Sequence, residues 1–338
     1  MLQKYKVVLT ALALSTALAL SGCAASVESP ASANGTDEAT TELVQVKMIK
    51  FSAASDNYAM SLGYEEGIFA KHGIELDFID APQVGANQVA SLLNGQLDVG
   101  NGSITGVMAA VSKGIAVQVF SAVAADNMMD EHTLYDTLVA ADSDIHSFKD
   151  LEGKIVAVNS LKSTWQSSVS EAIAKDGGDP ALVEFVQLGF PDQVPALTNG
   201  HVDAIFTSQP FATTMLGQGF RSIGDAQAIA LDNQRGVATI LQASERFLSE
   251  KPDVAQKFID ALQEASEYAN ENPEEVRDLA VRLAGATGDA EASIRNAPLP
   301  FYTTEIDADG VESWGELLVK FGYVETTPAA SDVLWVAP

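Results

Sequence analysis

Residues Asn87–Val99 read NQVASLLNGQLDV, and residues Asp192–Ala204 read DQVPALTNGHVDA, the same pattern 105 positions further along the chain. Six of the thirteen aligned pairs are identical, whereas random pairing at ordinary residue frequencies gives about one identity. Each copy predicts a capped short helix, an Asn-Gly stop in the left-handed conformation and a strand. Two interpretations stay open: a common helix-to-strand turn, or two related α/β lobes that hold a ligand between them.

Apolar segments of strand and helix length alternate through the folded part of the chain. This alternation predicts βαβ units. We therefore expect an α/β fold of two lobes, with two mostly parallel sheets joined by two hinge strands. The hinges are predicted near Thr137–Ala141 and Arg235–Thr239. Residues 43–138 and 238–338 then form lobe 1, and residues 139–237 form lobe 2.

The N-terminus has the order of a secretion signal. Two lysines precede the apolar run Val7–Leu20, and small residues follow. The run is shorter than the ~20 residues that a membrane-spanning helix needs. The tetrapeptide Leu-Ser-Gly-Cys that ends at Cys23 resembles the bacterial lipobox, whose cysteine becomes the lipidated first residue. We expect residues 1–22 to be a lipoprotein signal peptide, with Cys23 anchoring the protein to the extracytoplasmic face of the cell membrane.

Residues 23–42 are rich in Ala, Ser, Thr and acidic residues, a composition typical of a disordered tether. The formal net charge of −27 at pH 7 repels nucleic acid and anionic lipid, so no nucleic-acid partner is expected. Cys23 is the single cysteine, and the four histidines show no metal-ligand spacing. No Gly-x-Ser-x-Gly nucleophile motif occurs. We expect no catalytic residue, no metal, no cofactor and no enzymatic activity.

Several segments, taken in order, resemble one protein family: the substrate-binding proteins of nitrate, sulfonate and taurine ABC importers, which also include binders of thiamine-pyrimidine precursors. The segments are GYEEGIFAKHGIELDF (63–78), LLNGQLDVG (92–100), SFKDLEGKIVAVNS (147–160), LTNGHVDAI (197–205), SQPF (208–211) and LQASERFLSEKPDVAQKFIDAL (241–262). The resemblance runs from residue 43 to about residue 285. It implies the periplasmic binding protein type II fold and a monomer that delivers a small-molecule ligand to an ABC permease and its ATPase. The yeast-type thiamine-pyrimidine synthase shares this fold, but its iron-binding cysteine cluster has no counterpart here.

Ligands of open parallel sheets bind beyond the carboxyl ends of the strands, where helix N-termini bind anions. This rule selects six loops of the sequence as the binding site. The candidate ligand-binding residues on these loops are Asp56, Asn57, Tyr58, Gly85, Asn101, Ser103, Thr105, Ser160, Ser163, Thr164, Trp165 and Gln209.

The hydroxyl groups near two predicted helix starts are the strongest candidates. We expect Ser103 in lobe 1 and Ser163 or Thr164 in lobe 2 to donate to one acidic group of the ligand, although each hydroxyl could instead cap only its own helix. Trp165 is expected either to stack on a flat ligand or to pack in the core. Gln209 replaces the acidic residue that often precedes Pro-Phe in the resembled family.

The expected ligand is a small organic anion such as a sulfonate, taurine, nitrate or a carboxylate. The alternative is an aminopyrimidine held by Asp56 and Trp165, because Asp56 suits an amine as well as an N-cap. An enzyme on this fold is the remaining alternative.

Overall fold

The computed structural model describes residues 43–338, apart from residues 52, 81–85, 126–133, 233–236 and 307. The signal peptide, the lipidated Cys23 and the tether predicted for residues 1–42 lie outside the described residues. Within the part that the structure describes, no helix is both long and apolar enough to cross a bilayer.

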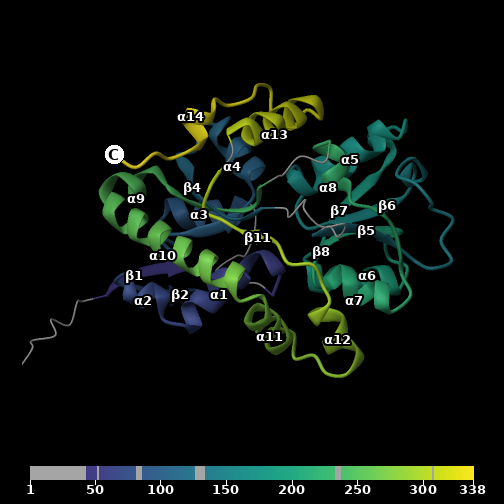
Figure 1. The fold of residues 1–338 in the computed structure, drawn as a ribbon. Helices are drawn as coiled ribbons and strands as arrows, with labels where there is room; N and C mark the ends of the chain where they lie inside the picture. The colour runs from purple at the N-terminus through teal and green to yellow at the C-terminus, as the bar shows by residue number, and fades with distance from the viewer. Residues whose placement is uncertain (1–42, 52, 81–85, 126–133, 233–236, 307) are drawn as a thin grey trace, which may run out of the picture. The chain divides into compact units, whose positions relative to one another are not determined.

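Two larger sheets and one strand pair organise the fold, and Figure 1 shows the two larger sheets next to each other. The pair consists of β1 (Val44–Met48) and β2 (Ile74–Phe78). The four-stranded sheet has the order β11 (Phe301–Tyr302), β4 (Val117–Ala125), β10 (Val237–Ser244) and β3 (Gly100–Gly102). The five-stranded sheet has the order β7 (Glu184–Gln187), β6 (Ile155–Val158), β8 (Ala204–Ser208), β5 (Tyr135–Val139) and β9 (Arg221–Gly224).

The α/β fold class is confirmed, but the strand directions differ from the mostly parallel prediction. β1–β2, β6–β7 and β6–β8 are parallel, whereas all pairs of the four-stranded sheet and both pairs of β5 are antiparallel. β10 enters its sheet from the other half of the chain and not through a crossover helix from a neighbouring strand. No βαβ unit therefore requires it to run parallel.

The chain passes between the two larger sheets earlier than the sequence predicts. β5 belongs wholly to the five-stranded sheet, so the first passage precedes Tyr135 and lies before the predicted Thr137–Ala141. The second predicted hinge, Arg235–Thr239, begins at residues that the structure does not describe. The last three residues of this predicted hinge are the first three residues of β10.

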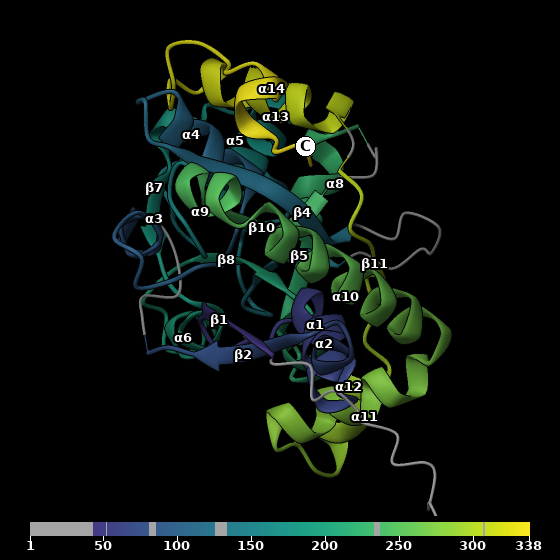
Figure 2. The same ribbon diagram turned by 90° about the vertical axis from the view of Figure 1, so that its left-hand side faces the viewer.

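Helices cover both sheets. In Figure 2 the long helix α10 (Pro252–Glu271) runs beside α1 (Tyr58–Glu65) and α2 (Ile68–Lys71), and it packs against both. The other helices are α3 (Ala86–Leu93), α4 (Ile104–Val111), α5 (Thr164–Lys175), α6 (Phe190–Thr198), α7 (Phe211–Gly217), α8 (Ala226–Ala230), α9 (Glu245–Glu250), α11 (Pro273–Ala284), α12 (Asp289–Arg295), α13 (Ala308–Lys320) and α14 (Ala330–Val333).

The repeated sequence builds the same turn twice. Gly95 and Gly200 adopt φ values of 76° and 67°, the left-handed conformation that ends a helix most easily at glycine. The carboxylate of Asp98 accepts a hydrogen bond from the backbone N–H of Lys47 at 3.0 Å, and that of Asp203 accepts one from Ile155 N–H at 2.8 Å. Each aspartate therefore ties its turn to an earlier strand, so the repeat has a structural role.

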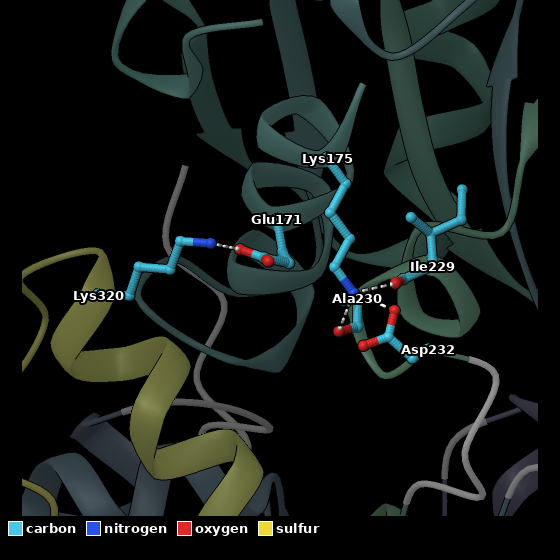
Figure 3. Close-up of polar contacts among 6 residues, drawn as sticks. All are labelled: Glu171, Lys175, Ile229, Ala230, Asp232 and Lys320. Atoms are coloured by element: carbon cyan, nitrogen blue, oxygen red, sulfur yellow. Dashed lines mark hydrogen bonds and ion pairs between the residues drawn. The ribbon is translucent and has the colours of Figure 1, made fainter. Parts of the chain in front are cut away.

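Helix α5 connects the two halves of the chain (Figure 3). Its buried Glu171 pairs with Lys320 of α13, with 2.5 Å between carboxylate oxygen and Nζ. At its C-terminal end, Lys175 Nζ donates to the carbonyl oxygens of Ile229 and Ala230, at 2.9 and 3.1 Å. Ile229 and Ala230 are the last two residues of α8. α5 therefore contacts both α13 and the C-terminal end of α8.

Candidate ligand-binding site

A cavity of about 780 Å³ lies between loops of the two larger sheets. Its walls are the segments that follow β1, β3, β6 and β7, together with residues of β10. Four of the six loops predicted from the sequence therefore meet at one place. The size is within the ~300–1,000 Å³ typical of small-molecule sites.

Three helices begin at this cavity. The residues that precede α4, α5 and α6 are Ser103, Ser163 and Gly189, and all three line the wall. The Ser103 hydroxyl accepts from Gly106 N–H at 3.2 Å, and the Ser163 hydroxyl accepts from Trp165 N–H at 3.3 Å. Both serines thus cap their helices at the wall of the cavity. The positive ends of three helix dipoles favour an anion there.

Lysine side chains add positive charge to the same cavity. Lys50, Lys113 and Lys162 line it and are exposed, and none forms an ion pair with another described residue. In a chain with a formal net charge of −27, three ammonium groups that have no ion pair among the described residues make their part of the cavity wall locally positive.

An aromatic cluster forms part of the wall. The indole of Trp165 lies edge to face with Tyr135 and with Phe190, each at a centroid distance of 5.0 Å. Trp165 and Phe190 also line the cavity. Trp165 therefore packs in the core and presents a surface to the cavity, so the two interpretations of this residue do not exclude each other.

One carboxylate, that of Asp56, also lines the cavity. Asp56 is in a short 3₁₀ helix (Ser55–Asn57) between β1 and α1. Its carboxylate accepts hydrogen bonds from the Thr239 hydroxyl and from Asn57 Nδ2, the latter at 2.9 Å. Asn57 in turn accepts from Asn101 Nδ2 at 2.5 Å. Burial raises the pKa of Asp56 above its ordinary value, although these hydrogen bonds oppose the shift.

The structure brings most of the predicted site residues together. Those that line the cavity are Asp56, Asn57, Asn101, Ser103, Ser160, Ser163 and Trp165. Gly85 lies outside the described residues. The predicted residues that do not line the cavity are Tyr58, Thr105, Thr164 and Gln209.

Each of these four residues forms a hydrogen bond with another part of the protein, through its side chain or its backbone. The Tyr58 hydroxyl donates to the carbonyl oxygen of Ala53 at 3.0 Å. The backbone N–H of Thr164 donates to the Thr105 hydroxyl at 2.7 Å. The side-chain carbonyl oxygen of Gln209 accepts from the backbone N–H and the hydroxyl of Thr213 in the first turn of α7. The four residues therefore contact other parts of the protein, although residues next to them in the sequence line the cavity.

Residues that the sequence did not select complete the wall, above all Lys50, Lys113, Thr239 and Gln242. Lys50 lies two residues after the end of β1, so its position near the carboxyl end of a strand was a usable signal. Thr239 and Gln242 lie on β10, whose place beside β3 depends on a long-range pairing that no local pattern reveals. The side-chain Nε2 of Gln242 donates to Oε1 of Gln88 at 2.8 Å. The same nitrogen occupies the space that a Cβ atom at Gly102 would need.

The arrangement defines a two-lobed binding-protein fold whose cavity is lined by three helix N-termini and by lysines. The chain belongs to the NMT1/THI5-like family, whose model matches residues 54–276. Solved structures share the fold. The alkanesulfonate-binding protein SsuA from Xanthomonas axonopodis pv. citri, bound to MOPS, has a TM-score of 0.69 and 15% identity over 87% of this chain and 99% of that one.

Two further solved structures have the same fold. The periplasmic aliphatic sulphonate-binding protein SsuA from Escherichia coli has a TM-score of 0.65 and 18% identity over 88% of this chain and 93% of that one. The Candida albicans CA3427 gene product, which has the generic periplasmic binding protein fold, has a TM-score of 0.65 and 16% identity over 87% of this chain and 96% of that one.

Curated relatives correct one prediction. The 2'-hydroxybiphenyl-2-sulfinate desulfinases of Rhodococcus erythropolis and Rhodococcus qingshengii are 29% identical over 104 residues, which is 29% of this chain and 28% of each relative. The match thus spans little more than a quarter of these relatives. They are enzymes, and this finding contradicts the prediction from the sequence that the chain has no enzymatic activity.

Proposed function

We propose that this protein is an extracytoplasmic solute-binding protein of an ABC importer. It captures a small organic anion of the sulfonate type between its two lobes and delivers the anion to a permease. The observation that carries the proposal is the convergence on one cavity of three helix N-termini and of three lysines that form no ion pair within the part of the chain that the structure describes. Likeness to alkanesulfonate-binding proteins supports the same ligand class.

A thermal-shift and calorimetry screen tests the proposal. The panel contains methane- to hexanesulfonate, taurine, nitrate, benzenesulfonate, aromatic carboxylates and a thiamine-pyrimidine precursor. A ligand at a hundred times its Kd should raise the free energy of unfolding by ~2.7 kcal/mol. Stabilisation by the pyrimidine, without stabilisation by any sulfonate, would favour the precursor-binding alternative.

Desulfination is a second candidate function, favoured by the desulfinase relatives. Its assay is the release of sulfite from biphenyl-2-sulfinate at saturating substrate. Sulfite release that scales with the protein concentration and disappears on heat inactivation would establish this activity.

Membrane anchoring belongs to the proposal as well. The sequence order of basic residues, apolar run and Leu-Ser-Gly-Cys supports lipidation at Cys23. A lipid anchor would hold the binding lobes close to a permease without a membrane-spanning helix.

A further inference from the structure

One face of helix α5 forms a polar contact between the two lobes that is separate from the cavity wall. The buried carboxylate of Glu171 pairs with Lys320 Nζ at 2.5 Å (Figure 3). One residue earlier, the side chain of Ser170 is hydrogen-bonded to the hydroxyl of Tyr323. None of these four residues lines the cavity. The contact therefore acts on the lobes themselves and does not touch a molecule in the cavity.

The two partners of the ion pair are anchored to different sheets. α13 packs against α4 beside the four-stranded sheet, where Trp314 and Met108 belong to one hydrophobic cluster. Lys320 is the last residue of α13, so it moves with that lobe. α5 packs against α8, and Ile173 of α5 belongs to the cluster that includes the core of β6 in the five-stranded sheet. Glu171 therefore moves with the other lobe.

The face of α5 that meets the other lobe is polar although it is buried. Thr164, Ser167 and Glu171 follow one another at spacings of three and four residues, so they lie on the same side of the helix, and all three are buried. The Ser167 hydroxyl has no hydrogen-bond partner among the described residues. Interfaces that separate are more polar than permanent ones, because their side chains must be hydrated in the separated state. The composition of this face therefore favours an interface that opens to water.

We propose that the pair of Lys320 and Glu171 is an interlobe latch, which forms when the lobes close, breaks when they open and thereby sets the ligand affinity from outside the cavity. The latch rests on the proposed function, because a carrier must open to take up its ligand. A buried Glu171 without its lysine is costly in the closed form, whereas water solvates the carboxylate in the open form. Since only the closed form binds tightly, the apparent Kd rises as the closed fraction falls.

Calorimetry with butane-1-sulfonate and benzenesulfonate tests the effect on affinity. Lys320→Met should weaken the binding of each anion that the wild type binds by at least fivefold. The double variant Lys320→Met/Glu171→Gln no longer buries a carboxylate without a cation, so it should regain most of this loss. The matched control is Lys71→Met, which breaks the ion pair of Lys71 with Glu264 between α2 and α10 of one lobe. The control should bind both anions as the wild type does.

Amide hydrogen exchange, followed by NMR without added anion, tests the closed form directly. Thr164 is the first residue of α5, so its N–H has no acceptor within the helix. This N–H donates instead to the Thr105 hydroxyl at 2.7 Å, across the lobe interface, and its protection reports closure. Exchange at Thr164 should be slow in the wild type and at least fivefold faster in Lys320→Met. The amides of β6 should keep their rates, because β6 pairs with β7 and β8 within one sheet.

The outcomes separate the latch from the proposed function. Wild-type affinity in Lys320→Met, or wild-type exchange at Thr164 in that variant, would overturn the latch and leave the carrier in place. An equal acceleration at Thr164 and in β6 would also overturn it, since the pair would then stabilise only the whole fold. If neither anion binds the wild type, the sulfonate-carrier proposal fails, and the exchange experiment alone decides whether the latch exists.

Discussion

The backbone N–H of Thr164 donates to the hydroxyl oxygen of Thr105 at 2.7 Å, and both residues are buried. Thr105 is in the first turn of α4 and Thr164 begins α5, so this bond joins the two halves of the chain directly beside the cavity wall. The first amide of α5 is therefore paired with protein, and Thr164, whose hydroxyl we expected to be a possible donor to the ligand, does not line the cavity. Ser103 and Ser163, their neighbours, are the residues that line the cavity.

Removing the Thr105 hydroxyl should destabilise the protein. Thr105→Val keeps the shape of the side chain but leaves the buried N–H of Thr164 without an acceptor, which should lower the free energy of unfolding by about 1–3 kcal/mol. Urea denaturation measures the change. Thr105→Ser retains the hydroxyl and should recover most of the loss, whereas a valine variant as stable as the wild type would show that the contact contributes nothing.

The ion pair between Lys320 and Glu171 should couple α13 to α5. Glu171 is nearly inaccessible while Lys320 is half exposed, so we expect a coupling energy of about 1–2 kcal/mol, below the ~3–5 kcal/mol lost when a fully buried pair is broken. A double-mutant cycle with Lys320→Met and Glu171→Gln measures it. The more exposed pair of Lys71 and Glu264 is the matched control and should couple by only about 0.2–1 kcal/mol. Equal coupling in both pairs would contradict this prediction.

Asp136 should make stability depend on pH. Burial raises the pKa of Asp136 to about 6, although the Ser222 hydroxyl opposes the shift. In the unfolded chain an aspartate has a pKa near ~3.9. Between these values the folded state binds a proton that the unfolded state has lost, so the contribution of Asp136 to stability falls as the pH rises through this window.

The substitution Asp136→Asn should therefore stabilise the protein at pH 7 by up to about 3 kcal/mol and change little at pH 4. Thermal or urea unfolding at the two pH values measures the difference. An effect of the same size at both values would mean that the carboxylate is not the cause.

Cys23→Ser should abolish membrane retention. Without the thiol the lipobox cannot be lipidated, so the protein should appear unprocessed or released into the soluble fraction. Fractionation of cells, with mass spectrometry of the mature N-terminus, measures both. A wild-type N-terminus without lipid would overturn the anchoring proposal.

Local sequence signals predicted the elements around the cavity well. α5 begins directly after the capping Ser163 and ends shortly before Gly177 and Gly178, which are start and stop signals that the sequence itself shows. The two Asn-Gly turns were also recognisable, since their left-handed glycines are encoded by adjacent residues. Seven predicted ligand residues line the cavity because the segments at the C-terminal ends of β1, β3 and β6, three strands that belong to different sheets, all reach it.

The remaining features depend on contacts between distant residues. The antiparallel place of β10 between β3 and β4 brings Thr239 and Gln242 to the cavity, and no periodicity in the sequence reports such a pairing. Gln209 had the right position for a ligand contact, but its side chain pairs with Thr213 four residues later. Lys113 lines the cavity from a position just after the C-terminal end of α4. The rule that ligands bind at helix N-termini could not select this residue.

The central claim, that the cavity between the two sheets binds an organic anion, is tested most directly by titration calorimetry of the best sulfonate from the screen. Wild-type protein is compared with the double variant Lys113→Gln/Lys162→Gln and with Lys149→Gln/Lys257→Gln, which neutralises two exposed lysines away from the cavity. We predict one ligand per chain, at least tenfold weaker binding in the cavity variant and unchanged binding in the control. Saturable binding of equal affinity in all three proteins, or no binding of any sulfonate to the wild type, would contradict the claim.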